Sequence, residues 1–143
     1  MLTSKDGSLE LKMELTKPFE AEHRGWISYR MTFCRAGNTE FVFESTNDNP
    51  LFLDAAIEPE VPTICSGIRN AIQDRTCFAY EPIDDRDFRL VVDAQNEFPL
   101  VSIQFADVSA PVDFRWASGV EVTRNDLSSF VAKLETQFFE QTN

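Results

Sequence analysis

The clearest pattern along the chain lies near its C-terminal end, after a short expected strand at residues 120–122. Apolar residues recur there at intervals of three and four, as on one side of an α-helix: Leu127, Phe130, Val131, Leu134 and Phe138. Thr123 or Asn125 is expected to cap the first turn, where the negative charge of Asp126 is favourable. The pattern predicts an amphipathic helix that needs an apolar surface to cover.

The same spacing occurs once more in the middle of the chain. The apolar residues of this second stretch are Val61, Ile64, Cys65, Ile68 and Ile72. Pro59 and Pro62 lie close to its beginning, and proline is tolerated in the first turn of a helix. We therefore predict a second helix over roughly residues 61–74.

Most of the remaining apolar residues alternate with polar ones, which is the period of a strand with one buried face. This alternation predicts strands at residues 9–15, 26–35, 39–44, 88–92, 100–105 and 112–116, and residues 77–80 are compatible with a further short strand. Residues 51–57 are apolar but too few to distinguish a strand from a helical turn. Ala36-Gly37-Asn38 separates two of the strands and predicts a hairpin.

Short polar connections between successive strands favour antiparallel pairing. We therefore predict a single α+β domain over residues 1–143. Its largely antiparallel sheet has about six to seven strands, packed on one face by the C-terminal helix and by the helix near residues 61–74.

The charge of the chain restricts its partners. Acidic residues number 24 against 13 basic ones, which gives a net charge of −11. Such a surplus opposes direct binding to nucleic acids and to anionic membranes. It suits a basic protein partner, although it also serves solubility alone.

The cysteines and the first residues indicate a cellular compartment. Cys34, Cys65 and Cys77 are odd in number and widely spaced, so a disulfide framework is not expected. The start of the chain lacks the apolar segment of a signal peptide, and no run is long enough to span a membrane. We expect a cytoplasmic protein.

Catalytic motifs are sparse. His23 is the only histidine, and no serine lies in a GxSxG motif. The five glycines are isolated, which excludes a phosphate-binding GxxxxGK[ST] loop and a GxGxxG motif. The cysteines and His23 never come within zinc-ligand spacing. We therefore expect no metal, no cofactor and no enzymatic activity.

Two features remain as candidate sites. Glu81, Asp84, Asp85 and Asp87 form the densest acidic group, a set of donors that suits a hard cation, a general acid–base pair or a cationic protein surface. Arg86 and Arg89 lie among them, as in a solvated turn. Trp26 falls on the strand face opposite its apolar neighbours, either covered by a loop or offered to a partner.

Several short features occur together in this chain: Asp6-Gly7 before an alternating strand, Gly25-Trp26-Ile27 at a strand opening, Tyr80-Glu81-Pro82, and Phe114 followed by Val122, Leu127, Phe130 and Leu134. Together they resemble the small WapI-type immunity proteins and related bacterial domains of unknown function. The resemblance implies a cytoplasmic protein that has no catalytic activity of its own and that neutralises a partner toxin. Many such toxins are basic.

The partner contacts that we predict are Trp26, Glu81, Asp84, Asp85 and Asp87. Two alternatives stay open, namely a regulatory or scaffold module with another protein partner and an enzyme that uses the acidic turn. The sequence does not distinguish a monomer from a dimer.

Overall fold

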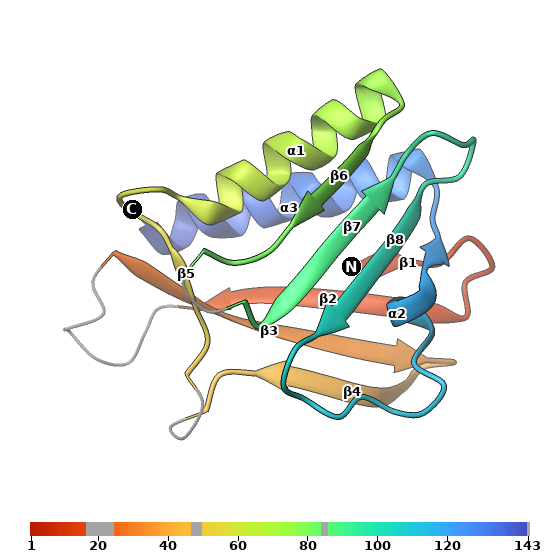
Figure 1. Ribbon diagram of the computed structural model, residues 1–143, viewed down its shortest axis with the longest axis horizontal. Coiled ribbons are helices and arrows are strands. Elements are labelled where there is room, and N and C mark those ends of the chain that lie inside the picture. The colour runs from red at the N-terminus through yellow and green to blue at the C-terminus, as the bar shows by residue number, and fades with distance from the viewer. Residues whose placement is uncertain (17–24, 47–49, 84–85, 143) are drawn as a thin grey trace.

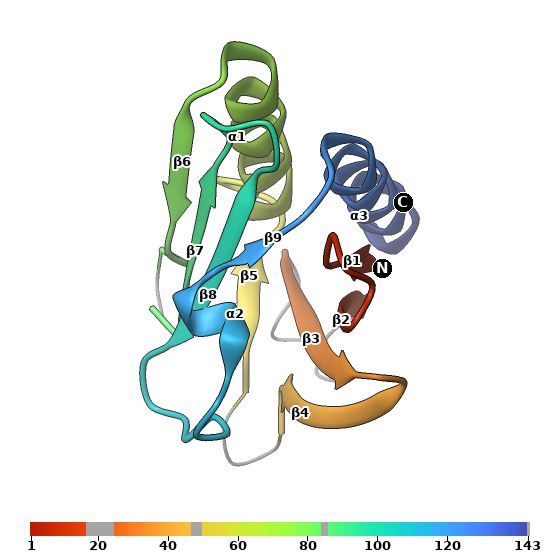
Figure 2. The same ribbon diagram turned by 90° about the vertical axis from the view of Figure 1, so that its right-hand side faces the viewer.

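The computed structural model describes residues 1–16, 25–46, 50–83 and 86–142. Its strands form two antiparallel sheets, and its two long helices lie next to each other along one side of them (Figures 1 and 2). The predicted α+β fold is confirmed. The strands are divided between two sheets, whereas the sequence pattern suggested one, because alternation marks the buried face of a strand but not its pairing partner.

The first sheet contains five strands in the order β1-β2-β3-β4, with β5 also paired to β3. Their bounds are β1 (Leu2–Thr3), β2 (Leu9–Thr16), β3 (Trp26–Arg35), β4 (Asn38–Glu44) and β5 (Phe52–Asp54). The predicted hairpin is present, with Ala36 and Gly37 both at positive φ between β3 and β4. The ambiguous stretch after Pro50 is a strand, since Phe52–Asp54 pairs with the beginning of β3.

The second sheet contains four strands in the order β6-β7-β8-β9. Their bounds are β6 (Cys77–Tyr80), β7 (Phe88–Asp93), β8 (Leu100–Phe105) and β9 (Val120–Glu121). The two sheets meet through a cluster of aromatic rings, in which Phe105 of β8 lies 4.4 Å from Phe43 and 5.3 Å from Phe41, measured between ring centroids. Packing between phenylalanine rings thus holds the two sheets together.

The predicted strand at residues 112–116 is wrong. Phe114 donates its N–H to the carbonyl of Pro111, and a single turn of helix, α2 (Arg115–Ser118), follows. Phe114 and Trp116 are buried, as the alternation required, but Val112 is fully exposed. Because Pro111 has no backbone N–H to donate to a neighbouring strand, a turn is favoured over a strand at this position.

Both predicted long helices are present, as α1 (Glu60–Asp74) and α3 (Arg124–Thr142). Thr123 caps α3, because its hydroxyl accepts the N–H of Asp126 at 3.1 Å. The predicted apolar stripe of α3 is buried, with Phe138 partly so. Arg124, in the first turn, donates to the carbonyls of Ile72, Ala94 and Asn96, and thereby ties α3 to the end of α1 and to the β7–β8 turn.

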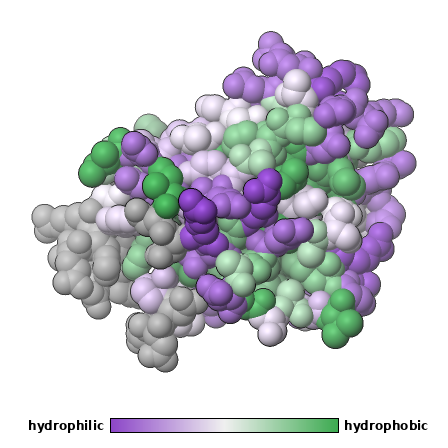
Figure 3. Space-filling model, in the orientation of Figure 1, coloured by the Kyte–Doolittle hydropathy of each residue, from purple (hydrophilic) through white to green (hydrophobic). Residues whose placement is uncertain are grey.

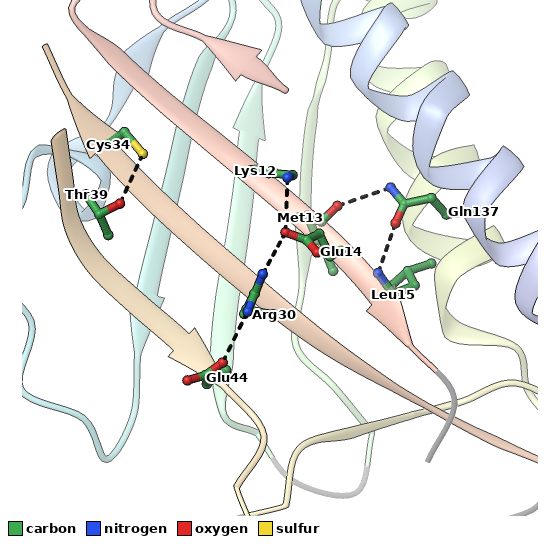
Figure 4. A network of polar contacts seen from close by, with 9 residues as sticks. All are labelled: Lys12, Met13, Glu14, Leu15, Arg30, Cys34, Thr39, Glu44 and Gln137. Atoms are coloured by element: carbon green, nitrogen blue, oxygen red, sulfur yellow. Dashed lines mark hydrogen bonds and ion pairs between the residues drawn. The ribbon is translucent and has the colours of Figure 1, made fainter. Parts of the chain in front are cut away.

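The exposed face of the first sheet is largely polar (Figure 4), although it includes Val42. Arg30 bridges Glu14 at 3.1 Å and Glu44 at 3.7 Å, and so links three neighbouring strands. Gln137 of α3 closes the edge of β2 beyond the short strand β1. Its side-chain amide accepts the N–H of Leu15 at 3.0 Å and donates to the carbonyl of Met13 at 3.1 Å, as a further strand would.

Candidate functional site

Two loops lie side by side where β5 leads into α1 and where β6 ends. The first is residues 54–59 and the second is residues 81–83, and together we call them the two-loop surface. They are joined by the side chain of Glu60, the first residue of α1. One carboxylate oxygen of Glu60 accepts the N–H of Asp54 at 2.6 Å, and the other accepts the N–H of Ile83 at 2.8 Å. A helix and two loops thus share one acceptor.

Glu60 is only 1% exposed, which is unusual for a carboxylate. A third donor, the Tyr80 hydroxyl, reaches it at 2.8 Å. Within the described ranges no cation contacts it, so these three hydrogen bonds and the N-terminal end of α1 offset the cost of burying its charge. Burial, followed by the bond to Glu60, raises the pKa of Tyr80, which keeps the phenol protonated as a donor.

Asp54 fixes the shape of the first loop. Its carboxylate accepts the backbone N–H groups of Ala56 at 2.9 Å, Ile57 at 3.0 Å and Glu58 at 3.3 Å. The bond from Ala56, with those from Glu58 and Ile57, lowers the pKa of Asp54, because each stabilises the ionised form. The loop backbone is therefore held in one conformation at neutral pH.

Each loop presents an exposed isoleucine. Ile57 is 89% exposed and Ile83 is 52% exposed, although such side chains are usually buried. The same segments contain Asp54, Glu58 and Glu81 but no lysine or arginine. In Figure 3, hydrophobic surface gathers where β5 leads into α1. The two-loop surface thus combines apolar tips with carboxylates.

Three of the predicted contact residues lie in the described part of the chain. Trp26 pairs in the ladder with Asp54, at the base of the first loop, and its half-buried ring packs edge to face against Phe52 at 6.3 Å. Glu81 lies in the second loop, and Asp87 is half-buried just before β7. Asp84 and Asp85 lie outside the described residues, as does His23.

The charge of Glu81 is largely neutralised. Its carboxylate lies 3.1 Å from the guanidinium of Arg89 and 3.8 Å from that of Arg86. The arginines within the acidic group therefore compensate it locally, as in a solvated turn. Attraction for a basic partner at this surface must depend more on Asp54 and Glu58, which form no ion pair with a described residue.

Ile57, Ile83 and Glu60 are residues that the sequence analysis missed. Both isoleucines stand outside every periodic pattern, next to Glu58 and Pro82, and that isolation in a polar turn was the available signal. Glu60 carried no signal, because an acidic residue in the first turn of a helix is ordinarily exposed.

Other chemistry is sparse in the described part of the chain. No group of three or more His, Cys, Asp or Glu residues is arranged there to hold a metal ion. The three cysteines are free thiols, and burial raises the pKa of Cys65 to about 12, so that it stays protonated. None of the described helices combines the length and the apolar character that a membrane span requires.

No family model matches this chain, and comparisons with curated proteins and with solved structures found no match.

Proposed function

We propose that this protein is a non-catalytic binding domain that recognises a basic protein partner through the two-loop surface. The observation that carries the proposal is the pair of exposed isoleucines on loops held together by the buried Glu60 carboxylate. Apolar side chains on a rigid backbone lose little conformational entropy on binding, and contribute contact area to a partner.

The charge of the whole chain supports a basic partner. A net charge of −11 attracts a cationic surface over a distance of about 10 Å at moderate ionic strength. Apolar contact at Ile57 and Ile83 would then provide the short-range part of the affinity, with Trp26 at the edge of the surface. This division of roles is common in complexes that form rapidly by electrostatic steering.

Within this proposal, the resemblance to WapI-type immunity proteins makes a basic toxin domain the specific partner and the cytoplasm the place of action. A regulatory or scaffold module would use the same surface for a different protein. The two differ in outcome, because an immunity protein abolishes the activity of its partner when added in equimolar amount.

The experiment is affinity capture with the immobilised wild-type chain and with the Ile57→Ser/Ile83→Ser double variant, from cells of the source organism. We expect a basic protein that the wild type retains, that about 0.5 M salt releases, and that the double variant fails to retain. Val112→Ser is the control, since Val112 is also an exposed aliphatic residue but lies between β8 and α2.

Two results would count against the proposal. Equal capture by the wild type and the double variant would exclude the two-loop surface, and capture that is indifferent to salt would exclude the electrostatic part. Once a partner is identified, an assay of its activity with and without the purified chain separates an immunity protein from a scaffold.

A further inference from the structure

A hollow of about 400 Å³ lies where the β1–β2 turn, the beginning of β8, α2 and β9 meet. Its volume is within the range of small-molecule sites. Figure 2 views this side of the molecule and shows β9 running from α2 toward α3. In Figure 1, α2, which contributes to its lining, lies at the end opposite to the junction of β5 and α1. It is thus separate from the site proposed for the protein partner.

The walls of the hollow are held by hydrogen bonds. Lys5 donates its backbone N–H to the carbonyl of Glu121 at 2.7 Å, which ties the β1–β2 turn to β9. Within the turn, the Asp6 carboxylate accepts the hydroxyls of Ser4 and Ser8, both at 2.7 Å, and the Ser8 N–H at 2.9 Å. These bonds keep the hollow open without a ligand, so that binding need not order its walls.

The lining divides into an apolar part and a charged part. Leu9, Leu100 and Val120 supply the apolar surface, and the charged residues are Lys5, Asp6, Arg115 and Glu121. Lys5 is already engaged, because its ammonium lies 3.8 Å from the Glu121 carboxylate and 3.8 Å from the centroid of the Phe98 ring. Asp6 is engaged by the two serines.

Arg115 differs from the other charged residues of the hollow. Within the described ranges its guanidinium makes no hydrogen bond and no ion pair, although acidic residues outnumber basic ones by 24 to 13. Five other arginines each pair with a carboxylate: Arg30, Arg35, Arg69, Arg86 and Arg89. The hydrogen bonds from Ser4 and Ser8, and the nearby charge of Arg115, lower the pKa of Asp6. The guanidinium N–H groups of Arg115 themselves are unused within the described ranges, and beside an apolar wall they provide a fork of donors for a planar anion.

We propose that this hollow binds a monocarboxylate that carries a branched apolar group, with the carboxylate on Arg115 and the apolar group against Leu9, Leu100 and Val120. A dianion such as phosphate is disfavoured, because two positive and two negative side chains around the hollow leave no net positive charge. The ligand chemistry has two sources, namely a small free acid and the C-terminal carboxylate of a polypeptide.

The test is an NMR titration of the isotopically labelled full chain with N-acetyl-leucine, which mimics the end of a polypeptide. We expect saturable shifts of the backbone amides of Lys5, Gly119 and Val120, with a dissociation constant on the order of 1 mM. N-acetyl-leucinamide lacks the carboxylate and acetate lacks the apolar group, so each should bind at least about tenfold more weakly. 4-Methylpentanoate, which has the carboxylate and the branched group but no acylamino group, distinguishes the two sources, since tighter binding of it than of N-acetyl-leucine indicates a small free acid.

Substitutions of the arginine complete the test. Arg115→Gln should weaken N-acetyl-leucine binding at least about tenfold, and Arg115→Lys, which keeps the charge without the fork, should lie in between. Arg75→Gln makes the same change at an exposed arginine just after α1 and should have no effect. Absence of saturable shifts up to about 20 mM, equal binding of acid and amide, or unchanged binding by Arg115→Gln would each overturn the proposal. Loss of partner capture by the two-loop variants would not affect it.

Discussion

Glu60 shows how one side chain organises a surface. A buried carboxylate is costly unless every oxygen is hydrogen-bonded, and Glu60 meets that condition with donors from β5, β6 and the second loop. Its bonds hold Ile83 directly and the base of the first loop at Asp54, whose carboxylate in turn holds the backbone of Ile57. Stability and the presentation of the two-loop surface therefore depend on the same residue.

Replacement of Glu60 tests this dependence. Glu60→Ala leaves two backbone N–H groups and the Tyr80 hydroxyl without their acceptor, so we expect the free energy of unfolding to fall by about 3 kcal/mol. Urea denaturation measures the change. Glu58→Ala, two residues away and exposed, is the control and should change stability by less than about 0.5 kcal/mol. Similar losses for both variants would contradict the role of Glu60.

Asp54 makes the first loop sensitive to acid. Its pKa is lower in the folded chain than in the unfolded chain, so its contribution to stability is complete above the unfolded pKa, about 4, and is lost as the pH falls through the folded pKa. Asp54→Asn should therefore lower the free energy of unfolding at neutral pH but have a progressively smaller effect below about pH 4. Urea denaturation of both proteins at neutral pH and below about pH 4 measures this difference. An equal loss of stability under the two conditions would show that the charge of Asp54 is unimportant.

At the scale of elements, α1 depends on a close approach to the strand that follows it. Gly67 faces the ring of Phe78 in β6, and a Cβ atom at this position would lie 2.1 Å from the ring. Glycine has a low helical propensity, but at this position its lack of a side chain allows the helix to contact the sheet. The contact matters because α1 also carries Glu60.

The Gly67→Ala variant tests whether helical propensity or packing against Phe78 has the larger effect on stability. Alanine favours the helix by about 1 kcal/mol, but displacement of the Phe78 ring costs about 1–3 kcal/mol, so we expect a net loss of stability. Thermal unfolding followed by circular dichroism measures it. Ser66→Ala changes the neighbouring exposed position of the same helix and should not destabilise the protein. A higher melting temperature for Gly67→Ala would show that the ring moves freely.

At the scale of the whole molecule, the surplus of negative charge opposes folding. The described ion pairs lie at the surface, where each contributes little, while a net charge of −11 produces repulsion throughout the compact chain. We expect the isolated protein to become more stable between about 20 mM and 300 mM sodium chloride, because salt screens this repulsion. The melting temperature measures it. A decrease would indicate that the ion pairs outweigh the repulsion.

The sequence by itself determined the elements that depend on local periodicity. Both long helices, the hairpin at Ala36–Asn38 and most strands follow from the spacing of apolar residues, because a helix or strand buries the same face along its length. The capping of α3 by Thr123 was also predictable, since a cap involves neighbours in the chain. Trp26 was singled out by its place on the polar face of a predicted strand, and Glu81 by the density of carboxylates around it.

Only the tertiary structure decided what residues far apart in the chain do together. The division into two sheets depends on pairing partners, and the turn at Pro111–Phe114 replaced a strand that alternation had suggested. The two-loop surface exists because Glu60 accepts hydrogen bonds from Asp54 and Ile83, which lie 6 and 23 positions away from it in the chain. Arg115 lines the hollow together with Asp6 only because α2 and the β1–β2 turn, far apart in the chain, meet there. Such relations arise from packing and hydrogen bonding between elements, which no local pattern encodes.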